Sequence, residues 1–387
     1  MTTRGYLEGY YGRLLEWHER TAMLDTLAEL GLGAYAYAPK EDGRHRLHWR
    51  EPYGAAWERA FRRFCDAARA RGVAVVAGLA PGLDFDFGHL DGGADFESAR
   101  VKLERLRECG ATRSMLLMDD IDDDFARRAG DQRSEGEAHA RLANRLGERL
   151  DVSLVVVPRV YAAELAADAP DYLADFARTL DARHALSVCG RDIVAREVDP
   201  EDCALPGERA VDRETILWDN LYANDYCPRR LFVGPWCGRH GVGDVLLNGT
   251  GLPATDRLLL ALMADGLGPG PGSDTDDDTI ERALSLLERH GVPRAFRRVA
   301  SAFRHPTTND RLDAPYPALE PTPDTLAALE ELLWRWKTPL AREWYPFLMS
   351  LRHDLLIDAD ALPPDRVRKT QSPPLARRLL RPRSRAG

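Results

Sequence analysis

The chain has 387 residues, of which 44% are hydrophobic and 30% charged, a balance typical of a soluble protein with one large domain or two. Its formal net charge is -9, but residues 366–385 hold eight basic and no acidic side chains. The first 365 residues therefore carry 45 basic against 62 acidic groups, and an acidic surface of this kind argues against nucleic-acid binding. No stretch reaches the roughly 18 apolar residues of a membrane span and no secretory core opens the chain, so we expect a cytoplasmic protein, without membrane contact, whose six cysteines are reduced.

Short apolar runs alternate with helical patterns along the first 268 residues. The apolar runs begin at residues 4, 33, 73, 114, 152, 184, 215 and 244. Segments with helical spacing cover residues 16–30, 54–71, 96–109, 135–150, 170–180 and 255–264. Continuous apolar runs are typical of parallel strands that are covered on both faces. Eight such runs alternating with helices predict a (β/α)8 TIM barrel over residues 1–268, with a doubly wound open sheet as the alternative.

In a barrel of this kind, catalytic side chains come from the carboxyl ends of the strands. Polar residues stand where nearly every apolar run ends: Glu8 and Gly9, Lys40, Asp84, Asp119 and Asp120, Tyr161, Cys189, Asp219 and Asn220, and Asn248. This repeated coincidence predicts one shared pocket at that end of the barrel.

The remainder of the chain divides by composition into three parts. An acidic, Gly/Pro-rich linker is expected at residues 269–279, a helical carboxyl-terminal region at 280–362 and a disordered basic tail at 363–387. Helical patterns within that region cover residues 280–290, 294–303 and 324–358. Trp334, Trp336 and Trp344 are interpreted as core packing residues; the alternative is a face through which two copies pair as a homodimer.

The segment LLMDDIDDD, residues 116–124, ends an apolar run with two adjacent carboxylates. Successive side chains of a strand point to opposite faces, so Asp119 and Asp120 can lean over one pocket only where the strand ends. Neighbouring carboxylates raise one another's pKa, which allows one to stay ionised while the other carries a proton. Cleavage of a glycosidic bond needs this division, because an acid protonates the leaving oxygen and a second group supports the cationic sugar centre.

A calcium-binding loop is the competing interpretation of the same acidic segment. The D-x-D-x-D pattern fits from Asp120 onward, but Phe125 replaces the required glycine and Asp131 the required glutamate. We therefore expect no metal site here and a solvated loop at residues 122–124.

Five motifs carry a family resemblance: EGYYGR from residue 8, YAYAPKEDGRHRLHWREPY from 35, APGLDFDF from 80, LLMDDID from 116 and WDNLYANDY from 218. In this order and spacing they resemble glycoside hydrolase family 84, the family of protein O-GlcNAcases and bacterial β-N-acetylglucosaminidases, over residues 6–248. The resemblance implies a retaining, exo-acting hydrolase of terminal β-linked GlcNAc that uses no metal and no cofactor. It also implies that the sugar's 2-acetamido oxygen attacks the anomeric carbon and forms an oxazoline, an exception to the two-carboxylate scheme.

The resemblance implies a role for each matching residue. Asp119 takes the acetamide N–H, and Asp120 is the general acid for the leaving oxygen and then the base for water. Contacts with the sugar or its acetamide are implied for Gly9, Lys40, Tyr161, Cys189, Trp218, Asn220, Asp225 and Asn248. Lys40 has separate support, because the chain has only four lysines against 49 arginines, and a lysine here suggests a need for a compact ammonium.

The sequence also departs from the family pattern near the acetamide pocket. Arg159 and Val160 precede Tyr161 where the family has Thr-Glu or Thr-Gln, and Cys189 places a thiol where it has a hydroxyl. We interpret Cys189 as lining the pocket rather than as a nucleophile, since no His–Asp pattern accompanies it. The expected partner is a GlcNAc-bearing glycoside or glycoprotein. Two alternatives stay open, a GlcNAc-binding protein with weak or lost turnover and a hexosaminidase of another N-acetylated glycan.

Overall fold

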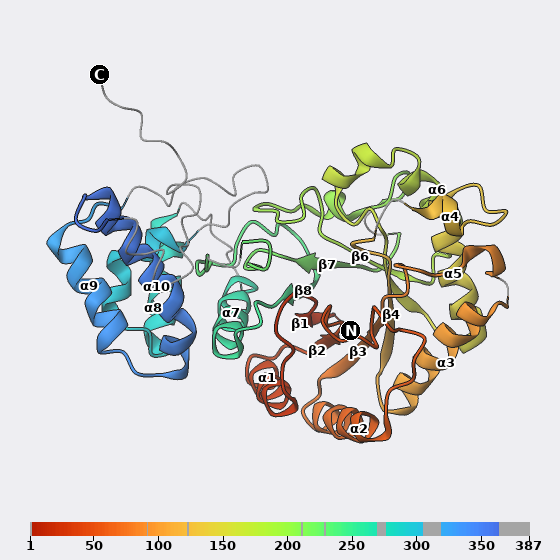
Figure 1. Cartoon of the computed structure of the whole chain (residues 1–387), viewed down its shortest axis with the longest axis horizontal. Helices are drawn as coiled ribbons and strands as arrows, with labels where there is room; N and C mark the ends of the chain where they lie inside the picture. The colour runs from red at the N-terminus through yellow and green to blue at the C-terminus, as the bar shows by residue number, and fades with distance from the viewer. Residues whose placement is uncertain are drawn as a thin grey trace. The chain divides into compact units, whose positions relative to one another are not determined.

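Eight parallel strands close into a barrel in the computed structural model of the chain (Figure 1). The strands are β1 (Arg4–Glu8), β2 (Ala34–Tyr37), β3 (Ala74–Leu79), β4 (Arg113–Leu117), β5 (Leu154–Val157), β6 (Ala185–Val188), β7 (Thr215–Asp219) and β8 (Asp244–Asn248). Each strand pairs with the next, and β1 pairs with β8, with Arg4 opposite Val245. The predicted (β/α)8 barrel is therefore confirmed and the open sheet is excluded.

The structure describes residues 2–90, 92–121, 124–209, 212–227, 230–268, 276–304 and 319–363. The chain divides into two compact units, one of Met1–Leu221 with Gly238–Pro253 and one of Tyr222–Cys237 with Ala254–Gly387. All eight strands belong to the first unit. Three predictions fall wholly or largely outside the described residues: the solvated loop at 122–124, the linker at 269–279 and the basic tail at 363–387.

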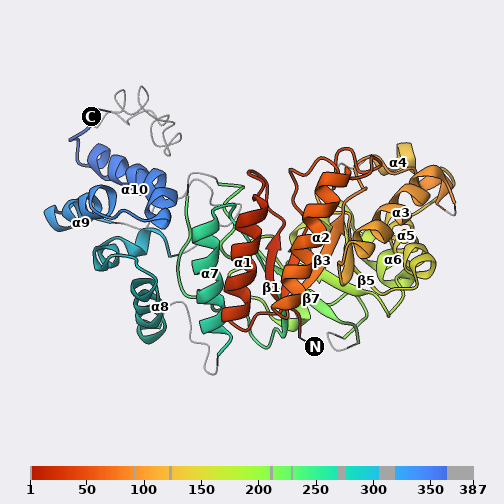
Figure 2. The same cartoon turned by 90° about the horizontal axis from the view of Figure 1, so that it is seen from below.

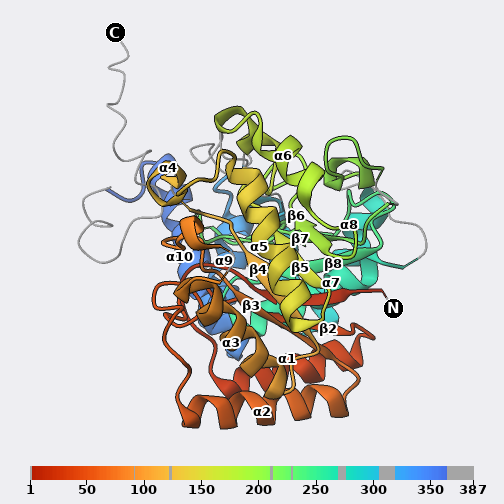
Figure 3. The ribbon, with the colours of Figure 1, turned by 90° about the vertical axis from the view of Figure 1, so that its right-hand side faces the viewer.

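Helices of the first unit lie along the outside of the strands, and Figures 2 and 3 show them from two sides. They are α1 (Trp17–Glu29), α2 (Ala55–Ala70), α3 (Ala94–Glu108), the short α4 (Phe125–Arg128), α5 (Glu135–Leu150) and α6 (Tyr172–Thr179). Short 3-10 helices occupy η1 (Phe87–His89), η2 (Ala163–Asp168) and η3 (Pro200–Cys203). The α1 helix begins at a capping box, in which the Glu19 carboxylate accepts the backbone N–H of Glu16 over 2.8 Å.

Side chains along each strand alternate between the barrel interior and the helices. On β2 the small residues Ala34 and Ala36 point into the interior core, where they leave room for larger neighbours. The intervening tyrosines point outward, and the ring of Tyr35 meets Phe64 of α2 edge-on at a centroid distance of 5.0 Å. Because this alternation has a period of two, a residue at a strand end can face the barrel mouth only if an even number of positions separates it from an inward-pointing residue of that strand.

Glu8, the last residue of β1, faces the helices and not the mouth. Its two carboxylate oxygens accept hydrogen bonds from the Arg20 guanidinium of α1, over 2.7 and 2.8 Å. The hydroxyl of Tyr35 donates to the same carboxylate over 2.7 Å. The prediction that Glu8 belongs to the strand-end pocket is wrong, because Leu7 is the inward residue there and Glu8 follows it.

The second unit is helical. Its helices are α7 (Pro253–Gly266, in this unit from Ala254 onward), α8 (Asp277–Arg289), α9 (Pro323–Trp334) and α10 (Pro339–Asp358), with 3-10 turns η4 (Arg294–Arg298) and η5 (Ala300–Ala302). The single helix predicted over 324–358 is broken at residues 335–338, because Pro339 opens α10 at the position where a proline suits a helix start. None of the helices within the described ranges combines the length and apolar character that crossing a membrane requires.

The three tryptophans of this region divide between core and surface. Trp336 and Trp344 are buried and their rings meet edge-on at 5.4 Å, and the indole N–H of Trp344 donates to the hydroxyl of Thr255 over 3.0 Å. Trp334 is 48% exposed. Core packing is therefore confirmed for two of the three, and pairing of two copies through these helices stays a prediction.

Candidate active site at the barrel mouth

Along each strand every second side chain points into the barrel, and this period of two continues past the strand ends to the residues at the barrel mouth. Steps of two from the inward residues of β1, β2, β4, β6, β7 and β8 lead to Gly9, Lys40, Asp119, Cys189, Asn220 and Asn248. All six are buried. Residues predicted separately from six strand ends are thus gathered by one geometric rule.

Asp119 and Asp120 lie around one buried ammonium. The β4 strand ends at Leu117, and Asp120 has a left-handed backbone with a φ of 54°. This turn frees Asp120 from strand alternation, so its carboxylate can lie beside that of Asp119. Nζ of Lys40 binds Oδ2 of Asp119 and lies 3.3 Å from Oδ2 of Asp120. The same ammonium therefore offsets the negative charge of both carboxylates.

Three donors converge on the carboxylate of Asp120. The hydroxyl of Tyr161 donates to Oδ1 over 2.7 Å, and the hydroxyl of Tyr11 donates to Oδ2 over 3.0 Å beside Lys40. Burial raises the pKa of Asp120, but the charge of Lys40 and these two hydrogen bonds together leave the pKa below its usual value. Asp120 is therefore ionised in this arrangement at neutral pH, whereas the sequence led us to expect the acid of the pair to carry a proton.

Asp119 keeps one carboxylate oxygen without a donor. Oδ2 is taken by Lys40, and Oδ1 is buried and accepts no hydrogen bond from any described residue. Leaving a buried acceptor unpaired costs about 1–3 kcal/mol, so this oxygen favours a ligand that brings an N–H or O–H donor.

A line of amide groups forms one wall of the mouth. The backbone N–H of Gly9 donates to Oδ1 of Asn248 over 3.1 Å, and Nδ2 of Asn248 donates to Oδ1 of Asn220 over 2.9 Å. The same Asn220 oxygen accepts the indole N–H of Trp218 over 3.0 Å. A methyl group added at Gly9 would lie 2.5 Å from the Trp218 ring, so only glycine fits against this tryptophan. The wall is held by hydrogen bonds from three strands.

Cys189 is buried at the barrel mouth as a protonated thiol. Nδ2 of Asn220 donates to its Sγ over 3.4 Å. Burial first, and then the charges of Asp119 and Asp120, raise the pKa of the Cys189 thiol well above its usual value. A neutral thiol is a weak nucleophile, which supports the interpretation of Cys189 as a wall residue.

Two other carboxylates named from the sequence have different surroundings. Asp219 faces outward and forms a buried ion pair with Arg239 over 2.5 Å. Asp225 belongs to the second unit, where its Oδ1 accepts the backbone N–H of Tyr226 over 3.0 Å. Asp219 therefore serves the framework, and the contact of Asp225 with a sugar stays a prediction.

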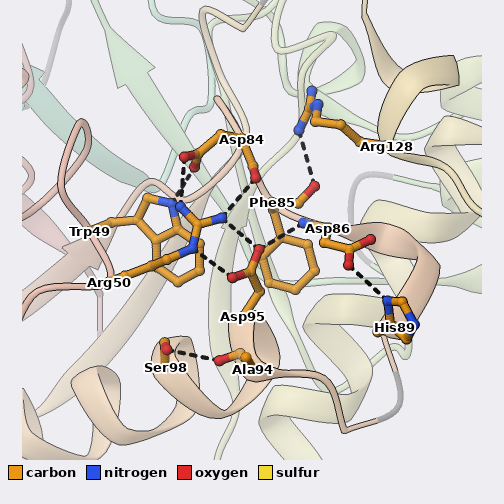
Figure 4. Close-up of polar contacts among 10 residues, drawn as sticks. All are labelled: Trp49, Arg50, Asp84, Phe85, Asp86, His89, Ala94, Asp95, Ser98 and Arg128. Atoms are coloured by element: carbon orange, nitrogen blue, oxygen red, sulfur yellow. Dashed lines mark hydrogen bonds and ion pairs between the residues drawn. The ribbon is translucent and has the colours of Figure 1, made fainter.

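Asp84 belongs to a network on the rim and not to the aspartate pair (Figure 4). Arg50 bridges Asp84 and Asp95, with N–O distances of 2.6 Å to each, and the indole N–H of Trp49 donates to Asp84 over 2.7 Å. The guanidinium also stacks on the Trp49 ring, 4.3 Å from its centroid. The network ties the loop after β2 to the loop after β3.

Strand alternation does not reveal two further residues that contact the pair. Tyr11 lies within the EGYYGR motif, three residues past the end of β1, and its hydroxyl reaches Asp120. Arg46 lies in the loop between β2 and α2 and donates to the backbone carbonyls of both Asp119 and Asp120. Both residues lie inside motifs that carry the family resemblance, and this was the sequence signal that could have pointed to them. Their contacts with the pair depend on how the loops fold.

A cavity of about 1080 Å³ borders Tyr161. It is bounded by the outward residues Leu186 and Val188 of β6 and by the turn η3, and among the predicted site residues only Tyr161 lines it. Among the residues that the structure describes, no group of histidine, cysteine or carboxylate side chains is arranged to hold a metal ion.

Comparisons with known proteins find similarity both in sequence and in fold. Residues 4–254 match the family model of β-N-acetylglucosaminidase. The protein O-GlcNAcases of Rattus norvegicus and Mus musculus are each 28% identical over 243 residues, which make up 61% of this chain and 26% of theirs. The chain thus spans about a quarter of the length of these curated relatives. A mutant O-GlcNAc hydrolase of Thermobaculum terrenum matches the fold with a TM-score of 0.70 at 21% identity, covering 92% of this chain and 85% of that one.

Proposed function

The chain belongs to the β-N-acetylglucosaminidase family, glycoside hydrolase family 84, and we propose that it is a retaining exo-β-N-acetylglucosaminidase. Its substrate is a terminal β-linked GlcNAc, on protein serine or threonine or on a small glycoside; the curated relatives are named protein O-GlcNAcases. The acetamide oxygen of the sugar attacks the anomeric carbon, the bond to the leaving oxygen breaks, and water later opens the oxazoline with net retention.

The surroundings of Asp119 are the observation that carries this proposal. One oxygen lies on the buried ammonium of Lys40 and the other is buried without a donor among the described residues. A substrate acetamide supplies the missing N–H donor. Accepting that N–H, the carboxyl group of Asp119 makes the acetamide oxygen more nucleophilic and stabilises the positive charge of the oxazoline as it forms.

Asp120 supplies and recovers the proton in this scheme. As acid it protonates the leaving oxygen, and as base it takes a proton from the water that opens the oxazoline. The lowered pKa of Asp120 depends on the charge of Lys40 and on hydrogen bonds from Tyr161 and Tyr11, whereas burial by itself raises it. We propose that bound substrate turns Tyr161 from Asp120 to the acetamide, so that burial then favours the protonated acid.

The mouth residues around the pair provide the sugar contacts. The ammonium of Lys40, the backbone of Gly9 and the amide of Asn248 are proposed to bind sugar hydroxyls. Trp218 and the thiol of Cys189 are proposed to face the acetamide, with Asn220 holding its polar end. Polar grips of this type are selective, because a sugar with a misplaced hydroxyl leaves buried groups unpaired.

One set of assays tests the proposed function. Wild type, Asp119→Ala and Asp120→Ala are compared on p-nitrophenyl β-GlcNAc, on its β-GalNAc epimer and on an alkyl β-GlcNAc glycoside. Asp120→Ala should lose on the order of 10²–10⁴-fold on the alkyl glycoside and much less on the p-nitrophenyl one, which needs little protonation. An inert wild type, or an Asp120→Ala variant undiminished on the alkyl substrate, contradicts the proposal. Preference for the epimer would instead assign a different N-acetylated glycan.

A second candidate is a GlcNAc-binding protein without turnover. The observation that favours it is the ionised Asp120, whose carboxylate is already held by Lys40, Tyr161 and Tyr11. Tight binding of a GlcNAc-oxazoline mimic, together with zero hydrolysis of every β-GlcNAc substrate, would establish this alternative.

A further inference from the structure

Arg46 is a buried cation that binds the backbone of both aspartates. Its guanidinium donates to the carbonyl oxygen of Asp120 over 2.5 Å and to that of Asp119 over 3.5 Å. Within the described residues it forms no ion pair with a carboxylate. Its charge is therefore directed at two consecutive peptide carbonyls of the turn that follows β4.

That turn determines where the acid of the pair points. Asp119 faces the mouth by simple strand alternation, and continued alternation would send Asp120 toward the helices. Instead Asp120 has a φ of 54°, an uncommon conformation for a residue with a side chain, and its carboxylate turns back to Tyr161 and Tyr11. A conformation of this kind persists only where surrounding contacts impose it.

We propose that Arg46 is a positioning residue that imposes this turn and so aims the carboxylate of Asp120 at the leaving oxygen. The role rests on the proposed function, in which Asp120 is the general acid. A guanidinium suits it because a planar fork reaches two carbonyls at once, whereas a lysine ammonium is a single point donor.

The loop that carries Arg46 is anchored on both sides of it. Nζ of Lys102, from α3, donates to the carbonyl oxygens of Arg44 over 2.7 Å and Glu51 over 2.5 Å. Arg50 is tied to Asp84 and Asp95 in the rim network of Figure 4. Arg46 is thus presented to the turn by a loop whose own position is set by α3 and the loop after β3.

The test compares Arg46→Met and Arg46→Lys with the control Arg44→Met. Arg44 lies in the same loop, is about half exposed and pairs with Glu51 over 3.5 Å, so its loss removes a cation without touching the turn. For Arg46→Met we expect kcat on an alkyl β-GlcNAc glycoside to fall about 100-fold, kcat on the p-nitrophenyl glycoside to fall less than about tenfold, and KM to change less than about threefold. Arg46→Lys should lie between this variant and wild type, and Arg44→Met should match wild type.

The split between leaving groups separates positioning from folding. Loss of folded protein lowers the apparent kcat on both substrates by the same factor. Equal losses of kcat on the two substrates in Arg46→Met therefore overturn the proposal, and so does an unequal loss that also occurs in Arg44→Met. If Arg46→Met does not fold, Arg46→Lys decides by the same split.

Crystal structures of the variants give a readout that does not depend on activity. In Arg46→Met or Arg46→Lys we expect Asp120 to leave the positive φ region and lose its hydrogen bond to Tyr161, and in Arg44→Met to keep both. An unchanged Asp120 in the Arg46 variants overturns the positioning role. An inert wild type overturns the proposed function instead, and the crystal comparison still decides whether Arg46 sets the turn.

Discussion

The hydroxyl of Tyr161 donates a hydrogen bond to Oδ1 of Asp120 over 2.7 Å, and on the other oxygen of the same carboxylate the hydroxyl of Tyr11 does so over 3.0 Å. Both bonds stabilise the ionised carboxylate. The residue that the proposed reaction needs as an acid is therefore ionised in this structure, and the two tyrosines are part of the reason.

Replacing Tyr11 by phenylalanine should move the pH profile toward higher pH. The hydrogen bond lowers the pKa of Asp120, so its removal raises that pKa. The acid must be protonated to cleave, so kcat/KM falls as pH rises through the free-enzyme pKa, and a higher pKa shifts this descending limb upward. The profile of kcat/KM for Tyr11→Phe is compared with that of Tyr345→Phe, a change in the second unit. A limb that stays in place or moves down would show that Tyr11 does not set the pKa of the acid.

Replacing Lys40 by methionine should destabilise the fold, and more so at high pH. The change leaves two adjacent carboxylates at the mouth without their shared cation, and breaking a buried ion pair costs about 3–5 kcal/mol. Loss of the lysine charge raises the pKa of Asp120 in the folded state, so protonation relieves the repulsion at acid pH and stability falls as pH rises. Urea unfolding at an acidic and a mildly alkaline pH measures this.

Lys337→Met is the matched control, because Lys337 is exposed and its loss should change the free energy of unfolding by less than about 0.5 kcal/mol. A Lys40→Met variant that is as stable as this control at both pH values would contradict the buried ion cluster.

A single methyl group at Gly9 should disturb the site more than the fold. The added Cβ would lie 2.5 Å from Cζ2 of Trp218 and 3.0 Å from Cγ of Leu7, so the tryptophan ring must shift. Overpacking of this kind costs about 1–3 kcal/mol of stability, and a wall displaced by about 1 Å can lower kcat/KM about 100-fold. Gly54→Ala is the control, since no atom lies within 4 Å of its added Cβ. Equal kinetics for the two variants would argue that Trp218 does not face the substrate.

Loss of Glu8 should affect stability and leave catalysis intact. Glu8→Ala removes the partner of the buried Arg20, which costs about 3–5 kcal/mol, yet Glu8 faces α1 and not the mouth. The activity of the folded fraction should therefore match wild type, measured by kinetics below the unfolding transition. Glu97→Ala, which removes an exposed pair with Arg100, should cost less than about 1 kcal/mol. A folded but inactive Glu8→Ala would place Glu8 in the reaction.

Local sequence patterns predicted much of the barrel and most of the strand-end residues that lie at its mouth. The alternation of apolar runs and helices predicted eight strands, and a period of two along each strand is enough to bring Gly9, Lys40, Asp119, Asn220 and Asn248 to one end. Hydrophobic period and strand geometry are short-range properties, so they can be recognised in a few consecutive residues. The same rule, applied to Glu8, would have placed it on the helix side.

The state and orientation of the acid were decided only by the tertiary structure. Asp120 is ionised because Lys40, Tyr11 and Tyr161 come from the segments after β2, β1 and β5, and it turns back at a positive φ where Arg46 holds its carbonyl. A pKa depends on charges and donors within a few ångströms, whatever their separation along the chain. The sequence alone therefore determined which strand-end side chains face the mouth, whereas the folding of the loops determined that Asp120 is ionised and where its carboxylate points.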